Sequence, residues 1–176
     1  LSGLPWIGVW FQTEEPTAIS GELRVEFLDV GQGDCTLVTL DGHAMLIDCG
    51  PEKSGTQIQY ELRKKGITHL DYLIGTHPDA DHIGGMDVIL SKFDCDCVIM
   101  PEEQRETRAY QNVQNAIWYR GYRVTAPRPG DVFELGDARF TILGPVWHYD
   151  EMNNHSVALR LLYGTTSFLF TGDAEE

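Results

Sequence analysis

The segment "GTHPDADHIGG" (residues 75–85) places two imidazoles and two carboxylates within a short stretch, from His77 to His82. Carboxylates this close together repel one another unless a positive charge lies between them. Histidine nitrogens and carboxylate oxygens are also common ligands of divalent metal ions. The simpler alternative is a solvated helix start with Asp81 as the N-cap. The density of ligand types favours a metal site, in which two dications offset the repulsion between Asp79 and Asp81.

The local pattern predicts that this cluster lies where a strand meets a helix. "LDYLIGT" (residues 70–76) predicts a buried strand before the cluster, and "HIGGMDVILSKF" (residues 82–93) predicts a helix after it. Loops at strand ends are where rigid scaffolds present reactive groups. In extended backbone His77 and Asp79 face the same way, so they can hold one ion. Asp81 and His82, at the helix start, can then hold a second. We expect the glycines that follow to let other segments approach the helix start closely.

The remaining elements predict one folded domain after a polar segment. Residues 1–22 are interpreted as an N-terminal linker and residues 23–176 as the domain. Strands are expected near both ends of the domain and helices between them, which indicates an α/β (α+β) protein with stacked sheets flanked by helices. The expected strands are 23–30, 35–40, 44–50, 97–101 and those after residue 123, with a final hairpin over 156–164 and 167–173; the other helices are 55–67 and 104–122.

Composition limits the classes of function. No window reaches the roughly 18 uninterrupted apolar residues of a membrane span, so no span is expected in this chain. The net charge of −14 repels nucleic acid and anionic membranes at long range. A bound dication can reverse the field inside a cleft, so the charge leaves a nucleic-acid substrate open.

The motifs resemble a known family. "THPDADHIGG" (residues 76–85) resembles the H-x-[HD]-x-D-H signature of the metallo-β-lactamase superfamily. Three further stretches resemble the version of this fold found in ComEC, the bacterial DNA-uptake channel protein, and in its free-standing relatives: "FLDVGQGDCTLV" (27–38), "AMLIDCG" (44–50) and "SFLFTGD" (167–173). The resemblance covers most of the chain and implies an αββα sandwich with a binuclear metal site at the sheet edge.

The resemblance also implies roles for individual residues. His77 and Asp79 match the ligands of a first metal ion, and Asp81 and His82 match those of a second. Asp173 matches the carboxylate that bridges both ions. Asp48 and Asp34 match outer residues that support the ligands, although turn chemistry alone is an equal alternative for Asp34.

Two departures from the family pattern affect the expected ligand set. The superfamily usually supplies a third histidine to the first ion, and His155 and His148 are the candidates here, with a polar supporting role as the alternative for His155. Asn153, Asn154 and Ser156 are expected to line the cleft. Relatives also continue to a late histidine, whereas this chain stops at Glu176. We therefore expect a fold without its last elements, with weak metal affinity or unfilled metal positions and low activity.

The function implied is a metal-dependent hydrolase, namely a phosphodiesterase or nuclease acting on phosphodiesters such as single-stranded DNA. Its water nucleophile would be held by the two ions together with Asp81 and Asp173. Asp79 in place of a histidine makes the ligands richer in oxygen, which favours manganese, with zinc as the alternative. Two other functions stay open: a hydrolase of another ester or amide on the same fold, and a catalytically silent module. By analogy with the family we expect an extracytoplasmic location, with the cytoplasm as the alternative.

Overall fold

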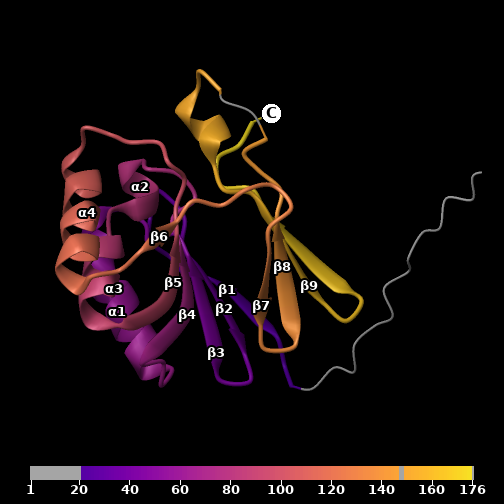
Figure 1. The fold of residues 1–176 in the computed structure, drawn as a ribbon. Coiled ribbons are helices and arrows are strands. Elements are labelled where there is room, and N and C mark those ends of the chain that lie inside the picture. Colours follow the sequence, from indigo (N-terminus) through magenta and orange to yellow (C-terminus); the bar gives the residue numbers. More distant parts are fainter. Residues whose placement is uncertain (1–20, 147–148, 176) are drawn as a thin grey trace, which may run out of the picture.

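The computed structural model describes residues 21–146 and 149–175, which form two facing β-sheets with helices over one of them (Figure 1). Most of the predicted linker of residues 1–22 lies outside the described residues, as does His148. The mixed α/β class predicted from the sequence is confirmed. No helix within the described ranges is long and apolar enough to cross a membrane.

The first sheet has six strands in the order β1-β2-β3-β4-β5-β6. Strands β1 to β3 pair antiparallel, whereas β3 to β6 pair parallel, and helices connect the parallel strands. The carboxyl ends of β3 and β4 therefore meet at one edge of the sheet. The bounds are β1 Arg24–Phe27, β2 Thr36–Leu40, β3 His43–Ile47, β4 His69–Ile74, β5 Asp94–Ile99 and β6 Val124–Thr125 for the strands, and α1 Gly55–Lys64, α2 Ala80–Ile83, α3 Met86–Lys92 and α4 Arg108–Arg120 for the helices.

The second sheet has four antiparallel strands in the order β10-β9-β8-β7. Their bounds are β7 Val132–Leu135, β8 Ala138–Ile142, β9 Leu159–Tyr163 and β10 Thr166–Phe170. Strands β9 and β10 form the predicted final hairpin, with Thr166 paired to Tyr163. The 3-10 turns η1 Glu52–Ser54 and η2 Met152–His155 lie in the loops before α1 and before β9. The hairpin carries residue 171 onward to the same edge as the ends of β3 and β4 (Figure 1).

Two apolar cores lie on either side of the first sheet. In β3 the side chains of Ala44 and Leu46 join the core beneath the helices, while Met45 and Ile47 join the core between the sheets. This alternation explains why β3 reads as an uninterrupted apolar run, since both of its faces are buried. Helices α1, α3 and α4 cover the outer face of the first sheet (Figure 1). Within residues 21–146 and 149–175 the outer face of the second sheet carries no α-helix.

The helix predicted over residues 82–93 is instead two helices, α2 and α3, that break at Gly84 and Gly85. A Cβ atom at Gly84 would lie 2.4 Å from the backbone nitrogen of Glu52, and one at Gly85 would lie 2.5 Å from the carbonyl oxygen of Cys49. The loop after β3 thus packs directly on the helix start, as the glycines predicted. The backbone N–H of Cys49 also donates to the carbonyl of His82 at 2.6 Å, which fixes α2 against this loop.

Candidate metal centre

The predicted site residues come from loops of both sheets. Asp48 follows β3, His77 follows β4 and His82 lies in α2, while Ser156 precedes β9 and Asp173 follows β10. The centre therefore lies at the edge where the two sheets meet, and no single supersecondary unit could form it.

Asp48 is the buried hydrogen-bonding hub of this edge, at 1% exposure. Its carboxylate accepts bonds from the backbone N–H of Thr76 at 2.8 Å and from the Thr76 hydroxyl at 2.7 Å. It also lies 2.8 Å from Nδ1 of His82. Because an ionised carboxylate can only accept, Nδ1 of His82 carries the proton of this bond. The lone pair of Nε2 is then left for another partner.

His77 is held in a similar way by two hydroxyls. Its Nδ1 lies 3.2 Å from Oγ1 of Thr76 and 3.3 Å from Oγ of Ser156. The Thr76 hydroxyl donates its hydrogen to Asp48, so it accepts from the N–H of His77. Nε2 of His77 is buried and has no hydrogen-bond partner among the described residues.

The Nε2 atoms of both imidazoles belong to one cluster. Ligand atoms of His77, His82 and Asp173 lie within 4.8 Å of one another, and Nε2 of His82 lies 3.3 Å from Oδ1 of Asp173. A buried polar atom without a partner costs about 1–3 kcal/mol, so the unpaired nitrogen calls for an explanation. A divalent cation fits, because neutral imidazole and carboxylate are the ligands it takes. A second group of ligand atoms comprises Asp34, Asp48 and His82.

The two imidazoles differ in their affinity for protons. Burial and the neighbouring His82 lower the pKa of His77. Burial alone would lower the pKa of His82 as well, but the hydrogen bond to Asp48 and the charges of Asp48 and Asp173 outweigh it and raise this pKa to about 9. Burial, together with the charges of Asp48 and Asp173, raises the pKa of Asp34 although His82 opposes this. The edge thus concentrates negative charge that a cation can neutralise.

The segment after β10 is fixed against the residues before β9. The backbone N–H of Asp173 donates to Oγ of Ser156 at 3.2 Å, and the N–H of Glu175 donates to Oδ1 of Asn154 at 2.8 Å. Gly172 has a φ of +53°, and a Cβ there would lie 2.9 Å from Cβ of Thr76. Ser156 and Asn154 therefore position the chain that carries Asp173.

Asp79 and Asp81 lie beside the cluster rather than in it. Oδ2 of Asp79 is 4.0 Å from Nε2 of His77. Asp79, and not Asp81 as in the alternative to a metal site, occupies the N-cap position of α2, although the Asp79 side chain makes no capping hydrogen bond. Asp81 lies in the first turn of α2, and the two ligand groups formed by the described residues do not include it.

The structure does not bring His155 into the cluster. Its Nδ1 lies 2.6 Å from Oε1 of Glu103, and its Nε2 lies 2.7 Å from the carbonyl oxygen of Tyr149. The ring is 3% exposed, so both nitrogens are engaged within a buried contact. The supporting role weighed for this histidine agrees better with the geometry than the ligand role.

Three residues at this edge were not predicted from the sequence: Thr76, Glu103 and Arg105. Thr76 is adjacent to the motif, and a hydroxyl next to a candidate ligand was a usable signal. Arg105 donates from Nε and Nη2 to Asp79 at 2.8 and 3.3 Å. Glu103 and Arg105 lie in a polar loop without a motif, so nothing local indicated their partners.

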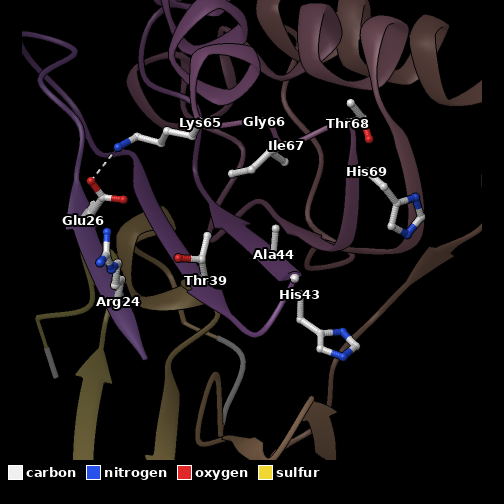
Figure 2. A pocket seen from close by; sticks show the side chains of 11 residues that line it. Arg24, Glu26, Thr39, His43, Ala44, Lys65, Gly66, Ile67, Thr68 and His69 are labelled. Atoms are coloured by element: carbon white, nitrogen blue, oxygen red, sulfur yellow. Dashed lines mark hydrogen bonds and ion pairs between the residues drawn. The ribbon is translucent and has the colours of Figure 1, made fainter. Parts of the chain in front are cut away.

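A separate pocket of about 340 Å³ lies at the opposite ends of β3 and β4 (Figure 2). His43 and His69 line it. His43 pairs with Asp71 at 2.6 Å, and Lys65 pairs with Glu26 at 2.7 Å. The pocket is thus lined by charged and polar side chains and is distinct from the candidate centre.

The chain is similar in sequence to known proteins. The chain is 29% identical over 177 residues to ComE operon protein 3 of Bacillus subtilis, covering 90% of this chain and 23% of that protein. It is 32% identical over 160 residues to Recombination protein 2 of Haemophilus influenzae, covering 86% of this chain and 18% of that protein. The chain therefore spans less than a quarter of these relatives, and the resemblance to ComEC-like proteins seen in the motifs is confirmed.

The fold also matches solved structures. MEM-A1, a subclass B3 metallo-beta-lactamase isolated from a soil metagenome library, superposes with a TM-score of 0.60 at 18% identity, over 89% of this chain and 61% of that one. The profile of the metallo-beta-lactamase superfamily matches residues 28–176, which include every residue of the candidate centre. The chain belongs to the metallo-beta-lactamase superfamily.

Proposed function

We propose that this protein is a metal-dependent phosphodiesterase or nuclease, with single-stranded DNA as the expected polymer. The observation that carries the proposal is the unpaired, buried Nε2 of His77, which lies with His82 and Asp173 in one cluster of ligand atoms. Such an arrangement is costly in a merely structural site and favourable in one that takes a cation.

The residues present fit divalent metal ions. His77, His82 and Asp173 would hold one ion at the observed cluster. Asp79, close to His77, and Asp81, at the start of α2, would extend the ligand set toward a second ion. When bound, such ions supply a water of lowered pKa and neutralise charge on phosphoryl oxygens. Manganese or zinc are the expected ions, with manganese favoured by the oxygen-rich set.

The chain's own residues perform the positioning. Asp48 holds the proton on Nδ1 of His82, and the Thr76 and Ser156 hydroxyls do the same for His77, so that Nε2 of each ring is the atom that would face an ion, with His82 losing its second proton on binding. The Asp173 side chain is 42% exposed, which leaves it open to a substrate and able to accept a proton from water.

A phosphodiester substrate is supported by the relatives rather than by the ligands. One relative is named Recombination protein 2, which indicates a process that acts on DNA. Metal ions at the centre would also reverse its negative field, so the overall charge of −14 does not oppose an anionic substrate there. An extracytoplasmic location stays a prediction.

The test combines metal content with substrate choice. We expect the purified protein to retain Mn²⁺ or Zn²⁺ and, with added Mn²⁺, to cleave bis-(p-nitrophenyl) phosphate but not nitrocefin. His77→Ala and Asp81→Ala should each lose bound metal and at least about 100-fold in cleavage rate. His69→Ala, at the opposite end of β4, is the matched control and should change neither.

Each contrary result selects another function. Preferential turnover of nitrocefin would favour a hydrolase of amides on the same fold. Absence of both bound metal and turnover in the wild-type protein would favour a catalytically silent module.

A further inference from the structure

Arg105 forms an ion pair with Asp79 at the rim of the candidate centre. Its Nε donates to Oδ1 at 2.8 Å and its Nη2 donates to Oδ2 at 3.3 Å, which is a two-pronged contact. The Arg105 side chain is 39% exposed and that of Asp79 is 28% exposed. A guanidinium has five N–H donors, and Asp79 takes two of them. The other three have no partner within residues 21–146 and 149–175.

The loop that carries Arg105 is fastened on both sides. Two residues earlier, Glu103 pairs with the buried His155, which belongs to η2. Two residues later, the hydroxyl of Thr107 accepts the backbone N–H of Tyr110 and caps α4. A loop held at both ends places its arginine at low entropic cost, which is the condition for a preorganised binding group.

The candidate centre is surrounded by negative charge, so an anionic substrate needs a cationic side chain such as Arg105 nearby. Asp34, Asp48, Asp79 and Asp173 all lie at the edge, and the whole chain carries −14. A phosphodiester is an anion, so it needs cationic contacts in addition to the ions that its attacked phosphorus would meet. A guanidinium suits this task because its planar fork matches phosphate oxygens, and Asp79 already fixes its orientation.

We propose that Arg105 binds the phosphoryl group of the substrate beside the metal centre, using the N–H groups that Asp79 leaves unused. This role rests on the proposed function, because it assumes metal ions held by His77, Asp79 and their neighbours. In this role Arg105 contributes to the affinity for substrate, whereas the ligand residues alone determine the affinity for metal ions.

The experiment separates affinity for an anion from affinity for a metal ion. Calorimetry first titrates Mn²⁺ into the protein and then inorganic phosphate into the Mn²⁺-loaded protein. The variants are Arg105→Gln, which removes the charge, and Arg105→Lys, which keeps the charge but not the fork. Arg108→Gln is the matched control. Arg108 lies three residues after Arg105, is exposed and pairs with Glu52.

We expect Arg105→Gln to keep the Mn²⁺ stoichiometry and to lose at least about tenfold in phosphate affinity, as expected for losing a charged hydrogen bond. Arg105→Lys should fall between, and Arg108→Gln should match the wild type. The Michaelis constant for bis-(p-nitrophenyl) phosphate should rise in the same order.

Three results would overturn the inference. Phosphate affinity of Arg105→Gln within twofold of wild type, with Mn²⁺ bound normally, would refute it and leave the proposed function intact. Loss of Mn²⁺ stoichiometry in both Arg105 variants would show that the arginine only holds Asp79. A wild-type protein that binds no Mn²⁺ would overturn the proposed function and this inference together.

Discussion

Asp48 and His82 form a buried pair, with Oδ2 of the acid 2.8 Å from Nδ1 of the imidazole and both side chains 2% exposed. On its other side the same imidazole places Nε2 3.3 Å from Asp173. The carboxylate of Asp48 thus sets the ring orientation, and that of Asp173 contacts Nε2. Such an acid–imidazole–ligand relay raises the basicity of the nitrogen and fixes its direction.

Replacing Asp48 by Asn should therefore weaken metal binding. An amide can accept only through one oxygen, so it cannot serve both Thr76 and His82 as the carboxylate does. We expect Mn²⁺ affinity to fall about 10- to 100-fold and the free energy of unfolding to fall by about 3 kcal/mol. Calorimetry and urea denaturation measure the two effects. Asp29→Asn, in the exposed part of the loop between β1 and β2, is the control and should change neither quantity. Unaltered Mn²⁺ binding in Asp48→Asn would contradict the proposed link from Asp48 through His82 to the metal ion.

Metal binding should release protons. The pKa of His82 is raised to about 9, above its unfolded value near 6.5, so its proton stabilises the metal-free fold below about pH 6.5 and this contribution is lost as pH rises through 9. A metal ion must displace that proton at neutral pH. Apparent Mn²⁺ affinity should thus rise roughly tenfold per pH unit between about pH 6 and 8.

Titrations of Mn²⁺ in buffers with different ionisation enthalpies would count the released protons, and EDTA should reverse the binding. An affinity that does not change over this pH range would argue against His82 as a ligand.

Adding one methyl group at Gly172 should disturb the centre. Its φ of +53° already disfavours a side chain, and the new Cβ would lie 2.9 Å from Thr76 and 3.0 Å from Ser156. We expect Gly172→Ala to lower the free energy of unfolding by about 3 kcal/mol and to weaken Mn²⁺ binding, because Asp173 follows directly.

Gly121→Ala is the control for backbone strain. Gly121 has a φ of +70° at the end of α4, and a Cβ there would meet no atom within 4 Å. Its cost should be about 1 kcal/mol, with Mn²⁺ affinity unchanged. Equal effects of the two substitutions in denaturation and calorimetry would show that the contact with Thr76 and Ser156 is unimportant.

Asp71 should give the protein a stability that depends on acid pH. Burial raises its pKa, but the hydrogen bonds from His43 and from the N–H of Ala44 outweigh this and lower the pKa overall. The stabilisation is therefore present above about pH 4, where the unfolded acid is ionised, and is lost as pH falls through the lower folded pKa.

Asp71→Asn should accordingly lower the free energy of unfolding by about 1–2 kcal/mol at pH 7, and the difference should shrink below about pH 3. Asp96→Asn is the matched control, because Asp96 pairs with His69 but is 67% exposed. It should change the unfolding free energy by less than about 0.5 kcal/mol. Urea denaturation at both pH values decides, and a difference that persists at low pH would contradict the assignment.

Local pattern was enough to predict most of the helices and strands and the strand end at which His77 lies. The apolar run of residues 70–76 and the motif that follows it indicated a strand that delivers His77 to a sheet edge, and β4 does so. The break between α2 and α3 was missed, because residues 82–93 have a continuous helical pattern. What requires glycine there is the close approach of Cys49 and Glu52, which belong to another loop.

The chain order and residue types thus predicted the α/β fold and a cluster of histidine and aspartate side chains of the kind that binds divalent ions, because strand periodicity and ligand chemistry are local properties. The direction of each imidazole, the engagement of His155 by Glu103 and the hold of Arg105 on Asp79 followed from packing alone. The contacts of His82 with Asp48, of Arg105 with Asp79 and of His155 with Glu103 each join residues at least 26 positions apart. Their pairing depends on how the two sheets and the β5–α4 loop meet in space, a relation that no local pattern encodes.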